Sequence, residues 1–490
     1  MELFKLSRMR WNKERLTFGR HFVITKSRND VITRNTEIDK KRCFYQLGKT
    51  LHLQNENSEM SKKISFKTLG CRVNLYETDA LASRFKAAGY EIAEGDNAAD
   101  VFVVNTCTVT NTSDQKCRQA IHQIRRKHPE ALIAVTGCMV NHRKEELLQS
   151  GIADYVIDNE RKAALFDIID EHFKAGHSDP EGYDRDLFSY QPAFDTFHTR
   201  SLIKIHDGCN NFCSYCIIPM VRGRSTSRPA EDIYNNVREV VAHGFKEIVL
   251  TGVNMGRYQY EGTNFEQLVE NILNIEGDFR VRVSSIEPDQ FSDRFLQLFQ
   301  HEKLAPHMHI CLQSGSDDTL KRMHRFYTVD QFRDMCQRIK VFRPDFNLTT
   351  DIIVGFPGET EQTFKESCDF AKEIGFSHIH TFKYSVRTGT KAATMPNQVP
   401  EKVKTERSEV MRQISLENKI KYFEMMQGRT QRMLIERIDS KGIARGYGEN
   451  YIPVLLSSCN AEKNTFINIK FEEIVNRGNE DKMAVVGVSS

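Results

Sequence analysis

The fold is decided by the segment Leu202-Ile-Lys-Ile-His-Asp-Gly-Cys209-Asn-Asn-Phe-Cys213-Ser-Tyr-Cys216. Its first half alternates apolar and polar residues, which predicts a β-strand, and its second half is a loop with three cysteines. The cysteines are separated by three and then two residues. Three thiolates leave one iron of a four-iron cluster without a protein ligand. An open iron can bind and activate a second molecule, so the loop indicates chemistry at iron.

Two simpler interpretations of this loop stay open. Cys213-Ser-Tyr-Cys216 taken alone is typical of half a zinc site or of a redox dithiol. Structural zinc needs a fourth protein ligand, and the nearest candidate, His206, lies in the predicted strand. A redox dithiol would leave Cys209 without a role. An iron–sulfur cluster therefore explains the spacing better than either alternative.

The loop resembles the signature of radical S-adenosylmethionine enzymes. The resemblance implies a [4Fe-4S] cluster on Cys209, Cys213 and Cys216 whose open iron is chelated by S-adenosylmethionine. Electron transfer would then cleave the sulfonium to a 5′-deoxyadenosyl radical. The resemblance also implies that the aromatic residue before the last cysteine, here Tyr215, lies near the adenine of this cofactor. The cofactor carries the chemistry in such enzymes, and the protein supplies position and seclusion.

The composition is that of a soluble globular protein of about three domains. The chain has 490 residues, of which 39% are hydrophobic and 28% charged. No apolar run approaches the ~18 residues of a membrane span, so we expect no membrane association. The 12 cysteines do not form a dense scaffold. Thiols kept for metal predict a reducing, cytoplasmic location.

The net charge of +3 conceals an uneven distribution. Residues 1–60 contain 13 Lys and Arg against 7 Asp and Glu, so the rest of the chain is slightly acidic. Binding of nucleic acid would therefore depend on local patches. The most suggestive patch is Arg222-Gly-Arg224-Ser-Thr-Ser-Arg228, directly after the cysteine loop. It predicts that Arg222, Arg224 and Arg228 contact an anionic substrate.

Residues 1–60 have no clear periodicity and no apolar core of a signal peptide. A strand-like run follows directly after Met60. We expect Met60 to be the natural start and residues 1–60 to be a disordered extension.

Residues 63–175 are predicted to form an α/β domain with a parallel sheet, because strands alternate with helices. The strands are expected at 64–69, 100–105, 131–136 and 155–157, and Asn74 is expected to cap the first helix. Cys71, Cys107 and Cys138 each follow one of the first three strands.

The carboxyl ends of parallel strands share one edge of a sheet, so these three thiols can converge. We therefore predict a second metal site on Cys71, Cys107 and Cys138. The alternative is that they are small buried residues, as free cysteines often are. Cys117 lies within the next predicted helix and is expected to be structural, and the remaining cysteines, Cys311 included, show no comparable pattern.

Residues 195–422 contain strand candidates at 202–206, 247–251, 280–286, 307–312, 348–354 and 378–384. Six strands with helices between them predict a partial (β/α)6 barrel, whose active groups gather at the carboxyl ends of the strands. Polar or glycine-rich turns follow several of these strands. The residues expected near S-adenosylmethionine are Thr251, Gly252, Glu287, Gln313 and Gly355.

A helix is predicted from Pro400 to about residue 422, because Pro is acceptable in a first helical turn. Residues 423–490 then alternate with period two at 432–438, 466–471 and 483–486. Several short strands in ~60 residues predict a small all-β barrel. Its charge is nearly balanced, so the residues alone leave RNA binding by this barrel open.

Residues 63–490 as a whole resemble the methylthiotransferase branch of radical S-adenosylmethionine enzymes. The resemblance is carried by Thr68-Leu-Gly-Cys71-Arg-Val-Asn74, Asn105-Thr-Cys107, Thr136-Gly-Cys138, the loop Cys209 to Cys216 with Ile217-Ile-Pro219, and Arg222-Gly-Arg224. It implies a second, auxiliary [4Fe-4S] cluster on Cys71, Cys107 and Cys138. It also implies that the C-terminal barrel is an RNA-binding TRAM domain.

The resemblance further implies a tRNA substrate. Leu250-Thr-Gly-Val-Asn254 resembles the branch that acts on N6-threonylcarbamoyladenosine. The isopentenyladenosine branch typically has Gln-Asn-Val-Asn there, and a third branch acts on a ribosomal protein. In the implied reaction one S-adenosylmethionine methylates a sulfur on the auxiliary cluster. A second is cleaved to a radical, and a methylthio group replaces hydrogen at C2 of adenosine 37. Arg222, Arg224 and Arg228 would contact tRNA phosphate or the threonylcarbamoyl carboxylate.

A rival interpretation is a non-catalytic iron–sulfur protein that binds RNA or carries electrons. A fully ligated cluster would suit that role, whereas two sets of three cysteines do not. The sequence identifies no general base, and it leaves both the electron donor and the sulfur donor unidentified.

Overall fold

The computed structural model describes residues 17–18, 22–23, 61–95, 97–194, 199–457 and 462–489. The chain divides into two units, residues 1–60 and residues 61–490. In the first unit only strands β1 (Thr17–Phe18) and β2 (Phe22–Val23) are described, and they pair antiparallel. The expected start at Met60 and the expected disorder of residues 1–60 lie outside the described residues.

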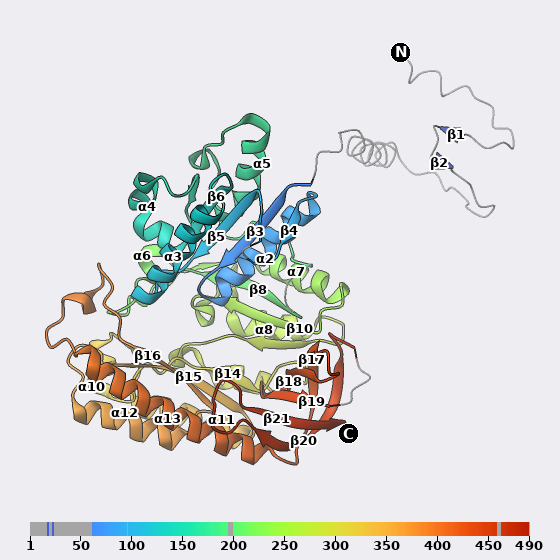
Figure 1. The fold of residues 1–490 in the computed structure, drawn as a ribbon. Coiled ribbons are helices and arrows are strands. Elements are labelled where there is room, and N and C mark those ends of the chain that lie inside the picture. The colour runs from blue at the N-terminus through green and yellow to red at the C-terminus, as the bar shows by residue number, and fades with distance from the viewer. Residues whose placement is uncertain are drawn as a thin grey trace. The chain divides into compact units, whose positions relative to one another are not determined.

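The N-terminal part of the second unit is a five-stranded parallel sheet in the order β4-β3-β5-β6-β7 (Figure 1). Its strands are β3 (Lys63–Thr68), β4 (Glu91–Ala93), β5 (Val101–Thr106), β6 (Leu132–Gly137) and β7 (Tyr155–Ile157). Strands β5 and β6 are buried along their whole length, as parallel strands covered on both faces are. The covering helices are α2 (Arg72–Ala87), α3 (Asn111–Lys127), α4 (Cys138–Ser150) and α5 (Leu165–Ala175).

The first helix starts earlier than predicted, and Asn74 is not its cap. Helix α2 begins at Arg72 with Cys71 as its N-cap residue. Asn74 is buried inside the first turn, where its Nδ2 donates to the carbonyls of Leu69 at 2.8 Å and Thr106 at 2.9 Å. The amide therefore joins the ends of β3 and β5, the two strands that carry Cys71 and Cys107.

The middle part is an open arc of parallel strands with helices on its outer side (Figure 1). Its strands are β8 (Arg200–Asp207), β10 (Glu247–Gly252), β13 (Arg280–Val283), β14 (His307–His309), β15 (Asn347–Val354) and β16 (His378–Lys383). They form two sheets that isolated parallel bridges, Val281 to Leu304 and Ile286 to Ile310, connect. The predicted partial barrel is thus confirmed. The strands of this arc pack against the outer helices in one apolar core.

The outer helices are α7 (Ala230–Ala242), α8 (Phe265–Leu273), α9 (Asp293–Leu298), α11 (Val329–Phe342) and α12 (Glu361–Ile374). Shorter elements are α6 (Ile218–Val221), β9 (Thr226–Ser227), β11 (Gln259–Tyr260), β12 (Thr263–Asn264) and α10 (Asp317–Arg322). No helix within the described ranges is long and apolar enough to cross a membrane.

The C-terminal part is a small closed barrel attached through a long helix. Helix α13 (Glu401–Met426) begins after Pro400, as predicted. It lies along α12 and reaches the barrel, so its Met411 belongs to the core of the arc and its Phe423 to the core of the barrel. The barrel order is β17-β18-β19-β21-β20. Its strands are β17 (Thr430–Ile438), β18 (Ala444–Tyr447), β19 (Pro453–Leu456), β20 (Phe466–Val475) and β21 (Ala484–Ser489).

The barrel places Tyr451 against the amino ends of the arc's strands. Tyr451 has a positive φ of 66° and accepts a hydrogen bond from Arg200 at 2.7 Å. The Arg282 guanidinium stacks 4.0 Å from the centre of its ring. These contacts cover the amino end of the lumen, so a substrate would enter from the carboxyl ends of the strands.

Candidate active site

One cavity of about 420 Å³ collects the three cysteines of the N-terminal part and the strand ends of the arc. Cys71, Cys107 and Cys138 all line it, together with Thr251 and Gly252. In the tertiary structure the three cysteines of the first set thus converge at one edge of the sheet, as the sequence predicted. The cavity lies where the two parts of the chain face each other.

Glycines at the strand ends permit this convergence. A Cβ on Gly137, which has a φ of 100°, would lie 2.4 Å from the carbonyl oxygen of Thr106. A Cβ on Gly70, at a φ of 115°, would lie 2.8 Å from Cβ of Cys107. Any side chain at either position would push the strand ends apart, and glycine alone tolerates these conformations at low cost.

The three thiols of this set line one cavity, as a cluster held by three cysteines would require. Burial raises the pKa of the Cys107 and Cys138 thiols, and the neighbouring Arg222 guanidinium opposes that rise at Cys138. Convergent sulfur ligands select soft metals and iron–sulfur clusters. Cys117 is buried in the core beside Cys107, and its Sγ lies 3.3 Å from the backbone nitrogen of Cys107. A packing role for Cys117 agrees with that position.

The second cysteine set lies in the loop after β8. Gly208, at a φ of 65°, allows the loop to pass close to Arg224, because a Cβ there would lie 2.0 Å from the Arg224 carbonyl oxygen. Cys209 donates its backbone N–H to the carbonyl of Gly223 at 3.1 Å. All three cysteines of this loop are partly exposed, so a cluster on them can be reached by a second molecule.

Hydrogen-bond donors are aimed at the sulfurs of this loop. Asn254 Nδ2 lies 3.4 Å from Cys209 Sγ, and Arg325 Nη1 lies 3.2 Å from Cys213 Sγ. The same Arg325 guanidinium is ion-paired with Glu287. Donors to cluster sulfurs tune the potential of the cluster. Sequence reasoning missed both donors, since only the folded chain brings them to the loop.

His206 is engaged elsewhere and does not suit a zinc site. Its Nε2 lies 2.8 Å from Ser225 Oγ, and its Nδ1 accepts from the Asn254 backbone N–H at 3.4 Å. Burial lowers its pKa to about 4, so the ring is neutral at physiological pH. Both ring nitrogens are therefore used inside the protein, which weakens the zinc interpretation of the loop.

Of the residues expected near S-adenosylmethionine, two line the 420 Å³ cavity and the others lie outside its lining. Thr251 and Gly252 line the 420 Å³ cavity. Tyr215 packs edge-on against Phe356, with ring centres 6.3 Å apart, and Glu287 is held at the loop by Arg325. Gln313 adopts a φ of 68° and bridges to β15 through its backbone.

Gly355, also expected near S-adenosylmethionine, lies outside the lining of the 420 Å³ cavity. Its N–H donates to the Glu359 carboxylate at 3.0 Å, and the Lys404 side chain occupies the space where a Cβ would lie. The backbone of Gly355 is thus committed to contacts within the protein, and Gly355 is not among the residues that line the cavity.

The three arginines after the loop have different environments. Arg222 is 2% exposed and Arg228 is 5% exposed, so neither is placed to reach a tRNA phosphate. The alternative contact, with the threonylcarbamoyl carboxylate, stays a prediction for Arg222, which lines the 420 Å³ cavity. Arg228 donates to Asn236 Oδ1 at 3.0 Å. Arg224 is exposed and stacks 4.6 Å from the ring centre of Phe212, which is itself 45% exposed. Of the three, Arg224 is the one exposed at the surface, where it can contact a tRNA phosphate.

Arg222 belongs to a buried network that joins the two cysteine-bearing parts. Its Nη1 donates to Asp207 at 2.8 Å and to Glu77 at 3.2 Å, and its Nη2 donates to Asn74 at 2.6 Å. Glu77 also accepts from Lys162 at 2.5 Å and from Lys204 at 2.8 Å. Three cations surround two carboxylates here. Burial alone would raise the pKa of Glu77, but the charges of Arg222, Lys162 and Lys204 hold it well below its usual range.

The lumen wall opposite the first cysteine set contains titratable residues that sequence analysis did not assign. Ligand atoms of His309, Cys311 and Asp351 lie within 4.8 Å of one another, so they could hold a metal ion. His309 Nε2 is already 3.2 Å from Asp351 Oδ1. The set was not predicted because β14 and β15 become neighbours only when the sheet forms.

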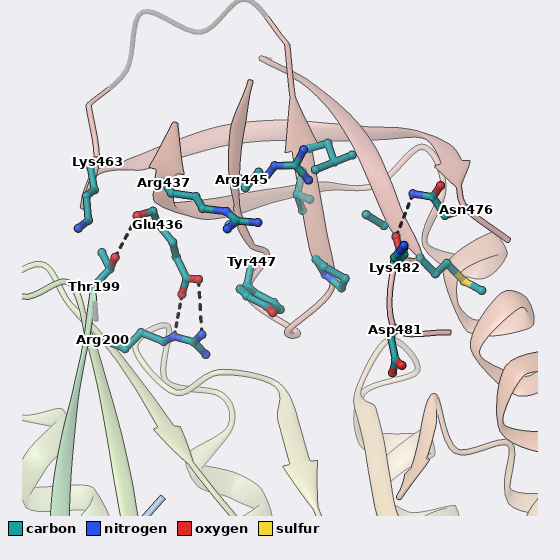
Figure 2. Close-up of a pocket in the computed structure, with 16 residues that line it drawn as sticks. Thr199, Arg200, Glu436, Arg437, Arg445, Tyr447, Lys463, Asn476, Asp481 and Lys482 are labelled. Atoms are coloured by element: carbon teal, nitrogen blue, oxygen red, sulfur yellow. Dashed lines mark hydrogen bonds and ion pairs between the residues drawn. The ribbon is translucent and has the colours of Figure 1, made fainter. Parts of the chain in front are cut away.

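A second cavity, of about 660 Å³, lies beside the C-terminal barrel (Figure 2). Its lining includes Thr199, Arg200, Glu436, Arg437, Arg445, Tyr447, Lys463, Asn476, Asp481 and Lys482. Arg200 Nε is ion-paired with Glu436 at 2.7 Å (Figure 2). Arg200 begins β8 and Asp207 ends it, so about 23 Å of strand separates this cavity from the cysteine loop. The cavity is therefore not part of the reaction site.

The fold and the two cysteine sets define a radical S-adenosylmethionine enzyme. The profile of the uncharacterized protein family UPF0004 matches residues 63–158, and that of the radical SAM superfamily matches residues 203–371. A solved structure with a similar fold is the radical S-adenosylmethionine methyltransferase TsrM from Kitasatospora setae, with cobalamin and a [4Fe-4S] cluster bound. Its TM-score is 0.50 at 14% identity, over 68% of this chain and 77% of that one.

Curated relatives match at least 80% of the chain. The chain is 38% identical over 423 residues to threonylcarbamoyladenosine tRNA methylthiotransferase MtaB of Bacillus subtilis, covering 83% of this chain and 93% of the relative. It is 36% identical to the enzyme of that name from Aquifex aeolicus, covering 80% of this chain and 96% of the relative. It is 35% identical to tRNA-2-methylthio-N(6)-dimethylallyladenosine synthase of Fusobacterium nucleatum, covering 84% of this chain and 97% of the relative. The chain therefore belongs to the radical S-adenosylmethionine methylthiotransferase family, and the predicted resemblance is confirmed.

Proposed function

We propose that this protein is a tRNA methylthiotransferase that places a methylthio group on C2 of N6-threonylcarbamoyladenosine at position 37. S-adenosylmethionine serves as methyl donor and radical source. The observation that carries the proposal is the shared cavity: Cys71, Cys107 and Cys138 line the same 420 Å³ space as Thr251 and Gly252 at the strand ends of the arc. A sulfur-bearing site and a radical-generating site must both reach one substrate atom. The cysteines of the second set do not line this cavity, but Asn254, two residues after Gly252, lies 3.4 Å from Cys209 Sγ, so the second set lies next to the strand end that does.

Each cysteine set would hold one [4Fe-4S] cluster. Cys209, Cys213 and Cys216 would hold the cluster that supplies the electron for reductive cleavage of S-adenosylmethionine. Asn254 and Arg325 would stabilise its charge through their contacts with Cys209 and Cys213. Cys71, Cys107 and Cys138 would hold the auxiliary cluster, which supplies the place for the transferred sulfur.

A buried acceptor supports a ligand at the first of these clusters. Asn254 Oδ1 is buried and has no hydrogen-bond partner within the described chain, although it lies in the residue that contacts Cys209. A buried polar atom without a partner costs free energy, so a bound ligand with an N–H group is its natural complement. The amino group of S-adenosylmethionine offers such donors.

The protein also supplies seclusion. The N-terminal part covers the carboxyl ends of the strands, and Tyr451 of the barrel covers their amino ends. Exclusion of water protects reactive intermediates from side reactions. The substrate base would be enclosed between these two covers.

The substrate tRNA would contact two surfaces. Arg224 and Phe212 expose a cation and an aromatic ring beside the cysteine loop, which suits phosphate contact and base stacking. The cavity beside the barrel collects Arg437, Arg445, Lys463 and Lys482, which together suit a phosphate backbone. A tRNA-modifying protein works where tRNA is found, so we place it in the cytoplasm.

An isopentenyl-type substrate is the second candidate, because relatives of both names match this chain. The lumen favours the threonylcarbamoyl group. Arg72, His309, Asp351 and His380 line the cavity, and a hydrocarbon chain could form neither a hydrogen bond nor an ion pair with these polar groups. A carboxylate and a hydroxyl can satisfy them.

Nucleoside analysis of tRNA from cells that lack the gene tests the proposal. We expect loss of 2-methylthio-N6-threonylcarbamoyladenosine and an unchanged level of the isopentenyl counterpart. Loss of the isopentenyl counterpart instead would transfer the protein to the second candidate function. The purified, anaerobically reconstituted protein is expected to hold about eight irons, four for each cluster. A protein that forms no 5′-deoxyadenosine from S-adenosylmethionine would not be a radical enzyme.

A further inference from the structure

Arg72 lines the 420 Å³ cavity directly beside the first cysteine set. It is the first residue of α2 and directly follows Cys71, so the start of the helix fixes its position beside the first cysteine set. It is exposed, and it lines the 420 Å³ cavity together with Ser284, Asp351 and His380. It also lines a smaller cavity of about 170 Å³, bounded by Leu202 and other residues deeper in the lumen.

Arg72 has no acidic partner in the described part of the chain. The hydrogen bond that its guanidinium makes is a long one, from Nη1 to the Ser284 carbonyl at 3.4 Å. Other arginines around the lumen are neutralised. Arg222 pairs with Asp207, Arg282 with Glu247, and Arg325 with Glu287.

The carboxylate of the cavity is committed elsewhere. Asp351 accepts from His309 at 3.2 Å and does not pair with Arg72. The exposed Arg72 guanidinium therefore presents several unused N–H donors and an unpaired positive charge to the cavity. An anion of a bound ligand would satisfy this guanidinium.

We propose that Arg72 binds the carboxylate of the N6 substituent of the substrate nucleoside, and so selects a threonylcarbamoyl group over an apolar one. This inference rests on the proposed function. A planar guanidinium matches a carboxylate through two parallel hydrogen bonds, which fixes direction as well as position. Because Arg72 is bonded to Cys71, the contact would also hold the adenine ring beside the first cysteine set.

S-adenosylmethionine carries a carboxylate too, so the shared chemistry is carboxylate recognition. The two sources differ in location, since S-adenosylmethionine is expected at Cys209, Cys213 and Cys216. The test must therefore separate binding of the nucleoside from binding of S-adenosylmethionine.

The first arm uses anticodon stem-loop RNAs with threonylcarbamoyladenosine, its methyl ester or isopentenyladenosine. The wild-type reconstituted protein is expected to prefer the free acid over the ester by about 10- to 100-fold in kcat/KM, as a charged hydrogen bond provides. Arg72→Gln should lose that factor on the free acid only, and Arg72→Lys should retain part of it. An equal loss on acid and ester would overturn the inference. Arg238→Gln, on the outer face of α7 and ion-paired with Glu231, is the matched control.

The second arm needs no turnover. Fluorescence anisotropy should show a Kd for the free-acid RNA that rises in Arg72→Gln, while the Kd for the ester stays constant. Equilibrium dialysis should give the same affinity for S-adenosylmethionine in both proteins, and iron content should be equal. Weaker binding of S-adenosylmethionine in Arg72→Gln would assign Arg72 to that ligand and overturn the inference. If the wild type binds the free acid preferentially but never methylthiolates it, the proposed function fails and the role of Arg72 stands.

Discussion

Arg222 and Glu77 form a buried ion pair at 3.2 Å that joins the two cysteine-bearing parts of the chain. Arg222 follows the loop of Cys209, Cys213 and Cys216, and Glu77 lies in α2 behind Cys71. The pair therefore helps to set the separation of the two proposed clusters. Arg222 also lies beside the thiol of Cys138, so its charge acts on the first cysteine set directly.

Replacing Glu77 should destabilise the protein strongly. Glu77→Gln leaves Lys162, Lys204 and Arg222 with a deficit of negative charge in a buried site. Breaking a buried pair by removing one partner costs about 3–5 kcal/mol. Urea unfolding of the two proteins measures the difference. Glu231→Gln, which breaks the exposed pair with Arg238, should cost at most about 1 kcal/mol. Equal effects of the two changes would contradict a structural role of the network.

The two cysteine sets should lose their irons independently. Cys71→Ala is expected to remove about four irons and methylthiolation while 5′-deoxyadenosine formation continues without RNA. Cys209→Ala should remove about four irons and abolish 5′-deoxyadenosine formation. Iron analysis and product chromatography distinguish the two. Cys368→Ala, in α12 and away from the cavity, should keep the full iron content. Loss of all irons in Cys71→Ala would argue against separate sites.

Arg325 should tune the cluster on the cysteine loop. Its guanidinium lies 3.2 Å from Cys213 Sγ, and a cation near a cluster favours the reduced form. Arg325→Gln is therefore expected to shift the midpoint potential of that cluster to more negative values. Arg325→Lys keeps the positive charge and should shift the midpoint potential less. A redox titration followed by electron paramagnetic resonance measures the potential. An unchanged midpoint in Arg325→Gln would show that the contact has no electrostatic effect.

Arg224 and Phe212 should contribute differently to tRNA binding. Losing one phosphate contact in Arg224→Ala should lower the slope of log affinity against log salt by about 0.9. Phe212→Ala should cost about 1–3 kcal/mol of stacking and leave that slope unchanged. Filter binding over a series of salt concentrations reads both quantities. Unchanged affinity and turnover in Arg224→Ala would remove this surface from the tRNA interface.

Asp79 should make stability depend on pH. Burial raises its pKa from 3.8 to about 7, and its Oδ1 has no hydrogen-bond partner in the described structure. The native state keeps the proton that the unfolded chain releases, so stability falls as pH rises from about 4 to about 7. Asp79→Asn removes this pH-dependent contribution to the free energy of unfolding, because the amide does not titrate. Relative to wild type it should gain about 2–4 kcal/mol between pH 4 and pH 8, measured by urea unfolding. A constant difference across that range would contradict the shifted pKa.

Local pattern predicted much of the fold because strands and their turns are encoded by neighbours in the chain. The predicted strands match β3, β5, β6 and β7 within about one residue at most ends, and the six strands of the arc are all present. The described strands that were not predicted have two to four residues each: β1, β2, β4, β9, β11, β12, β18 and β19. Segments that short carry too little periodicity to stand out.

Polar side chains were predicted less well, because their partners are distant in sequence. Asn74 looked like a helix cap, yet its amide binds Leu69 and Thr106 across two strand ends. Arg222 and Arg228 looked like free surface charge, yet Arg222 meets Glu77 145 residues away. A buried charge must find its counter-charge wherever the fold supplies one, and that choice leaves no local signal.

The sequence by itself determined the two cysteine sets, the order of the parts and the class of enzyme. Cysteine spacing and strand-end position are local properties, and thiols at the carboxyl ends of parallel strands meet at one edge. The tertiary structure alone decided which charges are free. It neutralises Arg222 within the network of Glu77 and Asp207, and among the residues that the structure describes it leaves Arg72 without an acidic partner beside Cys71. Packing distributes counter-charges between distant segments, so only the folded chain reveals which cation remains for a substrate.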